Sequence, residues 1–247
     1  MHYYDMAETW EFSDGPKLLY TQVIFQEGNK YFSAQLPEQI ACPNDIPPTT
    51  KIHLKEIPVE HIWPPLEDGL SICHDAEKPD IYIKKPRLTA YDGSESLSLY
   101  LLREARICQI LMQNEHQNIA RYLGCVVKDG RITGICFQKY VETLADSLDV
   151  GRLVDNKTCL QQVRAGIDHL HTLNLIHNDI HLGNIMVANQ EADTFVIIDF
   201  DSCAIKGHPL PEKRGQMPEG ACTAELVNDD LGFKMLQEEL HREKPSS

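Results

Sequence analysis

One short stretch of the sequence carries the residue types that phosphoryl transfer requires. His177, Asp179 and Asn184 follow the spacing His-x-Asp-x-x-x-x-Asn, and an apolar strand ending in Asp199-Phe200 comes soon after. A carboxylate can orient the attacking hydroxyl, and carboxylate and amide oxygens can hold magnesium on the phosphates. We therefore expect Asp179 to act on the acceptor hydroxyl and Asn184 and Asp199 to bind Mg²⁺.

Composition limits the partners of this chemistry. The chain has 247 residues, 42% of them hydrophobic, which allows one large domain or two lobes that share a cleft. Its net charge of −14 argues against a nucleic-acid-binding surface, which normally carries a basic patch. No apolar run is long enough to cross a bilayer, and the N-terminus lacks the pattern of a secretory signal. We expect no nucleic-acid and no membrane partner.

The cysteines indicate a reducing compartment. There are eight of them, far apart and without a Cys-x-x-Cys pair, so neither a stapled fold nor a zinc site is expected. Several lie inside apolar runs, where free cysteine behaves as a small buried hydrophobe. We expect structural thiols in a cytoplasmic protein, with the nucleus left open. The positions are 42, 73, 108, 125, 136, 159, 203 and 222.

Residues 1–60 are expected to form an N-terminal extension of modest order. Residues 23–25 and 30–32 are apolar and flank a Gly-Asn pair, which is typical of a small β-hairpin. Residues 37–50 hold four prolines among polar neighbours and are expected to be a linker.

The next part of the chain alternates strands with one helix. Residues 69–73 and 80–84 are expected to be two strands joined by a polar turn. Residues 97–112 carry apolar side chains at steps of three and four, which predicts a helix with one buried stripe. Residues 122–127 and 132–138 flank an Asp-Gly pair, a strong signal for a hairpin.

The second half is expected to be mostly helical. The apolar stripe of residues 158–173 predicts a helix directly before the Asp179 loop, and residues 228–242 show a similar pattern. A small hairpin is expected around residues 189–193, followed by a strand at 196–198. The whole pattern predicts an α+β fold.

Several motifs together resemble those of the protein-kinase-like superfamily over roughly residues 66–240. Ile81-Tyr82-Ile83-Lys84 is similar to the strand whose lysine grips the α- and β-phosphates, and Glu104 stands where the family has the glutamate that pairs with that lysine. Lys85 is an alternative match for the lysine. Lysine, glutamate, catalytic aspartate, asparagine and metal aspartate occur in the family's order, so the resemblance implies ATP and Mg²⁺ as cofactors.

The resemblance also implies roles for other residues and a domain layout. Gln138, Lys139 and Tyr140 resemble the hinge that meets adenine, and Asp229 resembles the aspartate that braces the catalytic loop. His177 is expected to pack under that loop. The implied fold is bilobal, with an antiparallel-sheet N-lobe carrying one helix at 61–140 and a shortened helical C-lobe at 141–245.

Four departures from the family pattern affect function. Gly69 is the only glycine in the window before Lys84, so it is the one candidate for a phosphate-covering loop, which is weaker than Gly-x-Gly-x-x-Gly. Asn178 replaces the arginine that receives an activation phosphate. Residues 203–222 contain no Ser, Thr or Tyr, so we expect no phosphorylation switch there. Asp201 replaces the glycine of Asp-Phe-Gly, and His181 replaces a lysine that contacts phosphate.

Three functions are consistent with these residues. The first is a divergent serine/threonine protein kinase that moves the γ-phosphate of ATP to a protein hydroxyl, with Asp179, Lys84, Glu104 and His181 as catalytic residues. The second is a small-molecule kinase, since His181 resembles the catalytic loop of aminoglycoside and choline phosphotransferases. The third is a weakly active pseudokinase that serves as a binding module.

Overall fold

The computed structural model describes residues 1–247 except 14, 190, 192 and 243–247. The chain forms two compact units, each made of segments that are distant in the sequence. The first unit comprises Met1–Glu67, Lys85–Leu102 and Val127–Gly134, and the second comprises Asp68–Lys84, Arg103–Val126 and Ile135–Ser247.

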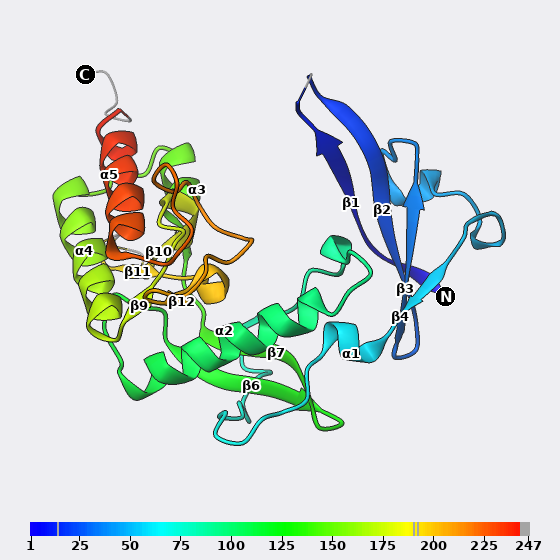
Figure 1. The fold of residues 1–247 in the computed structure, drawn as a ribbon, viewed down its shortest axis with the longest axis horizontal. Helices are drawn as coiled ribbons and strands as arrows, with labels where there is room; N and C mark the ends of the chain where they lie inside the picture. The colour runs from blue at the N-terminus through cyan, green and yellow to red at the C-terminus, as the bar shows by residue number, and fades with distance from the viewer. Residues whose placement is uncertain (14, 190, 192, 243–247) are drawn as a thin grey trace. The chain divides into compact units, whose positions relative to one another are not determined.

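The N-terminal part of the first unit is a four-stranded antiparallel sheet, drawn in blue and cyan in Figure 1. Its strands follow chain order, and the predicted hairpin is formed by β2 and β3, where Gly28 has a φ of +59° that suits glycine. The sequence predicted only the two strands of this hairpin, and the structure adds two further strands to the sheet. The strands are β1 (His2–Glu11), β2 (Lys17–Glu27), β3 (Lys30–Leu36) and β4 (Lys55–Ile57).

Both faces of this sheet bury apolar side chains, as the two-residue period of a strand requires. Val23 and Phe25 join one cluster with residues of β3, whereas Ile24 joins another with Leu88 and Tyr91. The predicted linker contains two short 3₁₀ turns. The short elements of the unit are η1 (Pro43–Asp45), η2 (Thr49–Lys51), α1 (Val59–Ile62) and η3 (Leu88–Ala90).

A second sheet has the strand order β5-β7-β6. It consists of β5 (Ile81–Lys84), β6 (Tyr122–Lys128) and β7 (Arg131–Gln138), and the long helix α2 (Ser96–Gln113) lies between β5 and β6 in the sequence. The predicted strand at residues 69–73 is wrong. The chain turns at Gly69, and only Ile72 forms a bridge, parallel to Cys125 of β6. Turns occupy residues 74–80, so this segment does not pair with β5.

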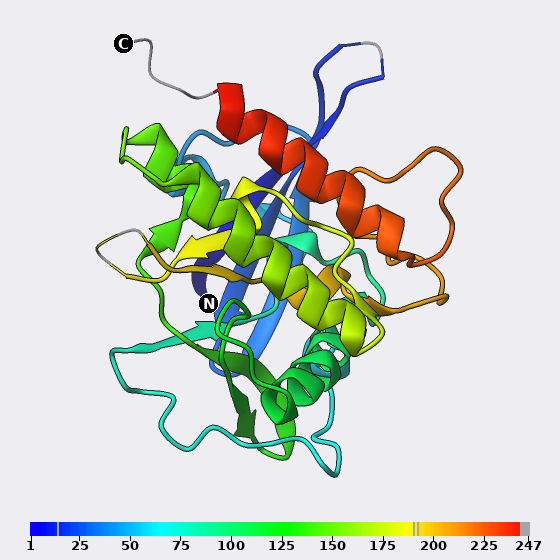
Figure 2. The ribbon, with the colours of Figure 1, turned by 90° about the vertical axis from the view of Figure 1, so that its left-hand side faces the viewer.

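The remainder of the second unit is built on two long helices, α4 (Asn156–Thr172) and α5 (Leu226–Arg242), which run side by side in Figures 1 and 2. The predicted hairpin around residues 189–193 is present as β10 and β11, although residues 190 and 192 of its turn lie outside the described residues. The other elements are α3 (Leu144–Asp149), β8 (Glu142–Thr143), β9 (Leu175–Ile176), η4 (Leu182–Asn184), β10 (Ile185–Val187), β11 (Phe195–Ile197), η5 (Phe200–Ser202) and β12 (Ala204–Ile205).

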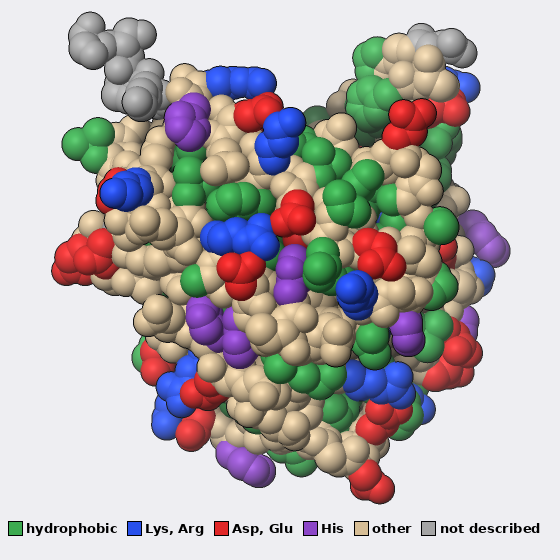
Figure 3. Space-filling model, turned by 60° about the vertical axis from the view of Figure 1, so that its left-hand side comes forward, with side chains coloured by type: hydrophobic (Ala, Val, Ile, Leu, Met, Phe, Trp, Pro, Cys, Tyr) green, Lys and Arg blue, Asp and Glu red, His purple; other side chains and the backbone are tan. Residues whose placement is uncertain are grey.

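The structure also shows the state of the cysteines and the distribution of charged side chains. All eight cysteines are free and five are buried. Acidic, basic and histidine side chains are interspersed over the face shown in Figure 3 and do not gather by sign. Among the described helices, none combines the length and apolar character needed to cross a bilayer.

Candidate active site

Lys84 lies at the centre of a cluster of carboxylates. It is the last residue of β5, and its Nζ lies 2.7 Å from Glu104 Oε1 and 3.3 Å from Asp201 Oδ2. The same ammonium group also contacts Asp199 Oδ1. Lys85 makes none of these contacts, so the structure supports Lys84 and not Lys85 as the lysine of the cluster.

Glu104 reaches Lys84 from the middle of α2 and is only 2% exposed. Burial raises the pKa of Glu104 to about 7, against the lowering effect of Lys84, and the charges of Asp199 and Asp201 add to the increase. Burial alone would lower the pKa of Lys84, but the three carboxylates around it outweigh that effect and raise it. The lysine is therefore firmly charged, and it fixes the position of a glutamate that would be costly to bury alone.

Asp199 sits where the chain leaves β11 and enters η5. Its backbone is left-handed, with a φ of +65°, and its carboxylate contacts Lys84. Burial favours a higher pKa for Asp199, but the charges of Lys84 and Lys213 hold it well below its usual value. Such a carboxylate stays ionised and available to a cation.

Lys213 is a member of the cluster that the sequence did not predict. Its Nζ lies 2.8 Å from Asp199 Oδ2 and 2.6 Å from Asp201 Oδ2, so each oxygen of Asp199 faces a different lysine. Asp201 stands where the family has glycine, and its carboxylate joins the same two ammonium groups. No local motif marks Lys213, because only folding brings a loop lysine onto these carboxylates.

The loop at residues 177–184 holds Asp179 and Asn184 against each other. Asn184 Nδ2 donates to the Asp179 backbone oxygen at 2.9 Å and to Asp179 Oδ2 at 3.0 Å. Burial would raise the pKa of Asp179, but its interactions with His181 and Asn184 and the nearby charge of His177 lower it. The loop thus presents an ionised carboxylate whose direction is set by an amide.

His181 flanks this carboxylate from the solvent side. Its Nδ1 accepts a hydrogen bond from the Gly183 backbone N–H at 3.1 Å, and its Nε2 lies 3.7 Å from Asp179 Oδ1. The interaction with Asp179 raises the pKa of His181, and burial opposes the increase only in part. The ring is half-exposed, so it can meet an incoming group.

Asp229 braces the loop at residues 177–184 through hydrogen bonds to its backbone, as predicted. It lies in the first turn of α5, is fully buried, and accepts hydrogen bonds from the backbone N–H groups of His177 at 2.9 Å and Asn178 at 2.8 Å. His171 Nε2 approaches the same carboxylate at 2.9 Å. The neighbouring Asp230 pairs instead with Arg164 on the surface.

His177 is a structural histidine, as expected. Its ring is completely buried, donates from Nε2 to the Ile198 carbonyl at 2.9 Å and meets the ring of Phe200 edge-on at 5.6 Å. These two contacts tie the loop at residues 177–184 to the segment around Asp199. The two parts of the sequence motif are thereby held in one arrangement.

The donor set of the cluster fits a hard divalent cation. Oxygens of Glu104, Asp199 and Asp201 lie within 4.8 Å of one another, and carboxylate oxygens are preferred by Mg²⁺. The ammonium group of Lys213 already stands as a cation on two of these carboxylates. Asn184 belongs to the neighbouring loop, where its amide nitrogen is committed to Asp179.

The predicted hinge residues have different surroundings. The backbone N–H groups of Gln138 and Lys139 donate to the carbonyls of Arg121 and Asp80, at 2.9 and 2.8 Å. Among the described contacts, none uses the N–H of Tyr140. The Tyr140 hydroxyl accepts from the Arg121 N–H at 3.0 Å.

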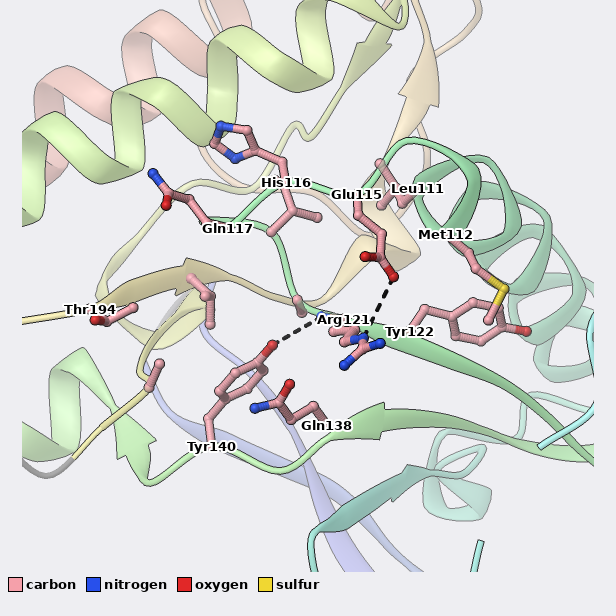
Figure 4. A pocket seen from close by; sticks show the side chains of 14 residues that line it. Leu111, Met112, Glu115, His116, Gln117, Arg121, Tyr122, Gln138, Tyr140 and Thr194 are labelled. Atoms are coloured by element: carbon pink, nitrogen blue, oxygen red, sulfur yellow. Dashed lines mark hydrogen bonds and ion pairs between the residues drawn. The ribbon is translucent and has the colours of Figure 1, made fainter. Parts of the chain in front are cut away.

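The side chains of Gln138 and Tyr140 line a cavity of about 530 Å³, shown in Figure 4. Arg121 and Glu115, which also line it, form an exposed ion pair of 3.5 Å. The lining of this cavity includes neither Lys84 nor the carboxylates around it. Gly69 lies in an exposed turn with a φ of +88° and is not a member of the Lys84 cluster.

Comparison with known proteins identifies the family. The protein kinase domain matches residues 69–217, more than half of the chain, so this protein belongs to the protein kinase domain family. Its α+β fold, with antiparallel strands and one helix before a helical part, is that of a bilobal kinase.

Three curated relatives are similar over part of their length. The human serine/threonine-protein kinase/endoribonuclease IRE2 is 30% identical over 152 residues, which are 55% of this chain and 15% of the relative. The Drosophila melanogaster serine/threonine-protein kinase Tao is 30% identical over 173 residues, 63% and 16% respectively. The serine/threonine-protein kinase/endoribonuclease IRE1 of Hypocrea jecorina is 29% identical over 136 residues, 50% and 10%. The chain thus spans a small part of each relative.

Proposed function

We propose that this protein is an ATP- and Mg²⁺-dependent serine/threonine protein kinase. The observation that carries the proposal is the contact of one ammonium group, Lys84 Nζ, with both Glu104 and Asp199. These residues lie 20 and 115 positions from Lys84, and the family needs the same three groups to hold the nucleotide phosphates. The names of the three relatives support hydroxyl groups of serine or threonine as acceptors.

Each residue has a defined task in this proposal. Lys84, positioned by Glu104, binds the α- and β-phosphates, and Asp199 and Asn184 hold the magnesium ion. When bound, magnesium would neutralise the negative charge that develops on the transferring phosphate. Asp179, aligned by the Asn184 amide, accepts the proton of the attacking hydroxyl.

The hydrogen bonds of the hinge residues limit which backbone N–H groups can bind adenine. Because the N–H groups of Gln138 and Lys139 are used within the fold, we assign the donor to adenine to the N–H of Tyr140. Gly69 remains the one candidate for a loop over the phosphates, although its turn is exposed. A single glycine would cover the triphosphate poorly, so we expect weaker nucleotide binding than in kinases with a full glycine-rich loop.

A small-molecule kinase is the second candidate, favoured by the half-exposed His181 beside Asp179. The acceptor classes can be separated by measuring transfer from ATP to generic protein acceptors and, in parallel, to sugars, choline-like alcohols and aminoglycosides. We expect transfer to the protein acceptors.

The test of the proposal is Mg²⁺-dependent ATP binding by thermal shift, combined with transfer assays of Asp179→Asn. The wild type should gain thermal stability with ATP and Mg²⁺ together, because a ligand of the native state stabilises it according to its occupancy. Asp179→Asn should keep this gain and lose about 10²- to 10⁴-fold in transfer rate. Asp168→Asn, a surface carboxylate on α4, is the matched control. A wild type that binds ATP but is no more active than Asp179→Asn on any acceptor would indicate a pseudokinase.

A further inference from the structure

The segment around Lys213 covers both carboxylates that the reaction needs. Lys213 Nζ lies 2.8 Å from Asp199 Oδ2 and 2.8 and 2.6 Å from the two oxygens of Asp201. Three carboxylate oxygens thus surround the ammonium nitrogen of Lys213. This ammonium group contacts Asp199 Oδ2, whereas Lys84 contacts Asp199 Oδ1. A metal ion that binds the Oδ2 side of Asp199 meets Lys213 first.

Two residues further on, Gly215 lies directly on the catalytic aspartate. Its backbone N–H donates to the Asn178 carbonyl at 2.9 Å. A Cβ at position 215 would stand 2.7 Å from Asp179 Oδ1 and 3.3 Å from Asp179 Cα, so the backbone approaches as closely as glycine allows. The surface of Asp179 that would receive an acceptor hydroxyl is therefore in contact with this segment.

Charge explains why the segment stays there. Glu104, Asp199 and Asp201 bring three formal negative charges, and Lys84 alone balances one of them. Lys213 reduces the imbalance to a single charge. Its side chain is half-exposed, so the lysine can leave without opening the core.

We propose that Lys213 is an internal cation that takes the place of the metal in the nucleotide-free protein, and that Lys213 and Gly215 together form a strap that keeps the kinase latent. The proposal rests on the assignment of Asp199 as a metal ligand in the proposed function. Metal binding must displace Lys213 from Asp199, and the departure of Lys213 releases the strap from Asp179. Residues 203–222 hold no Ser, Thr or Tyr, so phosphorylation of those residue types in this segment cannot release the strap.

In this arrangement Asp201 anchors the strap. Both of its oxygens contact Lys213 Nζ, at 2.6 and 2.8 Å, whereas Asp199 offers Lys213 one oxygen, at 2.8 Å. A metal ligand and a strap anchor respond oppositely to Asp201→Asn. Loss of a ligand weakens metal binding, whereas loss of an anchor frees Asp199 and strengthens it.

The experiment measures Mn²⁺ binding to the nucleotide-free full chain by electron paramagnetic resonance, with Mg²⁺ as competitor. Carboxylate sites accept both ions, and free Mn²⁺ gives a direct signal. Lys213→Gln should tighten Mn²⁺ binding by about tenfold, because the apparent dissociation constant falls as the competent state becomes fully populated. Gly215→Ala should also tighten it without any change of charge. Asp201→Asn should shift in the same direction, and Lys206→Gln, an exposed lysine on the same segment, should not shift.

Unchanged Mn²⁺ affinity in folded Lys213→Gln, or no Mn²⁺ binding to any variant, would overturn the proposal. Weaker binding in Asp201→Asn would overturn the anchoring role of that residue. Circular dichroism of each variant establishes that it is folded, and Gly215→Ala and Lys213→Gln perturb the strap by independent means. If Lys213→Gln binds Mn²⁺ more tightly but no variant binds ATP, the kinase function fails while the internal cation stands.

Discussion

Removal of the buried carboxylate of Asp229 should destabilise the protein more than any surface change nearby. The carboxylate accepts from two backbone N–H groups, those of His177 and Asn178, and from His171, at 2.8 to 2.9 Å. A hydrogen bond to a charged group contributes about 1.5–3 kcal/mol, and bonds to one acceptor are not additive. We therefore expect Asp229→Ala to lower the free energy of unfolding by about 3–5 kcal/mol, a large share of a typical total.

Two further variants make the reasoning specific. Asp229→Asn keeps the shape and one acceptor oxygen but turns an NH₂ group towards a backbone donor, so about 2 kcal/mol should be lost. Asp230→Asn is the matched control, since Asp230 is half-exposed and pairs with Arg164 on the surface, where a pair contributes at most about 1 kcal/mol. Urea unfolding followed by circular dichroism measures all three. Equal losses at positions 229 and 230 would refute the bracing role.

Three other outcomes follow from the same contacts. Lys84→Ala should weaken ATP binding about 10- to 100-fold in a thermal-shift titration, whereas Lys85→Ala should leave it unchanged. The reverse result would assign the phosphate-binding role to Lys85. The Asp179 carboxylate raises the pKa of His181, so the stability this contact contributes is complete below about pH 6.5 and is lost as pH rises through the raised value. Unfolding curves of His181→Gln should lack this pH dependence. Gly232→Ala should cost about 1–3 kcal/mol in urea unfolding, because its Cβ would stand 2.9 Å from a backbone carbonyl oxygen of the catalytic loop; an unchanged midpoint would show that α5 can shift.

The part of the fold that sequence could predict is the part with strong local patterns. The apolar stripes of α2 and α4 stand three and four residues apart, and the structure has helices within two residues of the predicted bounds. The Asp129-Gly130 turn has positive φ at both residues, as that pair favours. Such features depend on neighbours in the chain, so the chain alone reveals them.

The N-terminal sheet was only partly predictable, because its stability comes from pairing between segments. β1 is rich in polar and charged residues and has no clear apolar alternation, yet it pairs along most of β2. For residues 69–73 the error is the opposite, a predicted strand that does not form. Its residues favour a strand, but the segment makes only one bridge, from Ile72 to Cys125 of β6. β-structure depends on tertiary partners more than helices do, which explains both errors.

The departures from the kinase pattern that looked independent in the sequence are connected in space. Asp201 adds a negative charge where the family has glycine, and His181 removes a positive charge where the family has lysine. Either change alone would leave the phosphate site more acidic and less suited to a triphosphate. Lys213 lies on Asp199 and Asp201 at hydrogen-bond distance and returns one positive charge to the same place. If the Lys213 segment acts as the proposed strap, its movement would change the charge beside Asp199 and the access to Asp179 together, because Lys213 and Gly215 stand two residues apart on one segment.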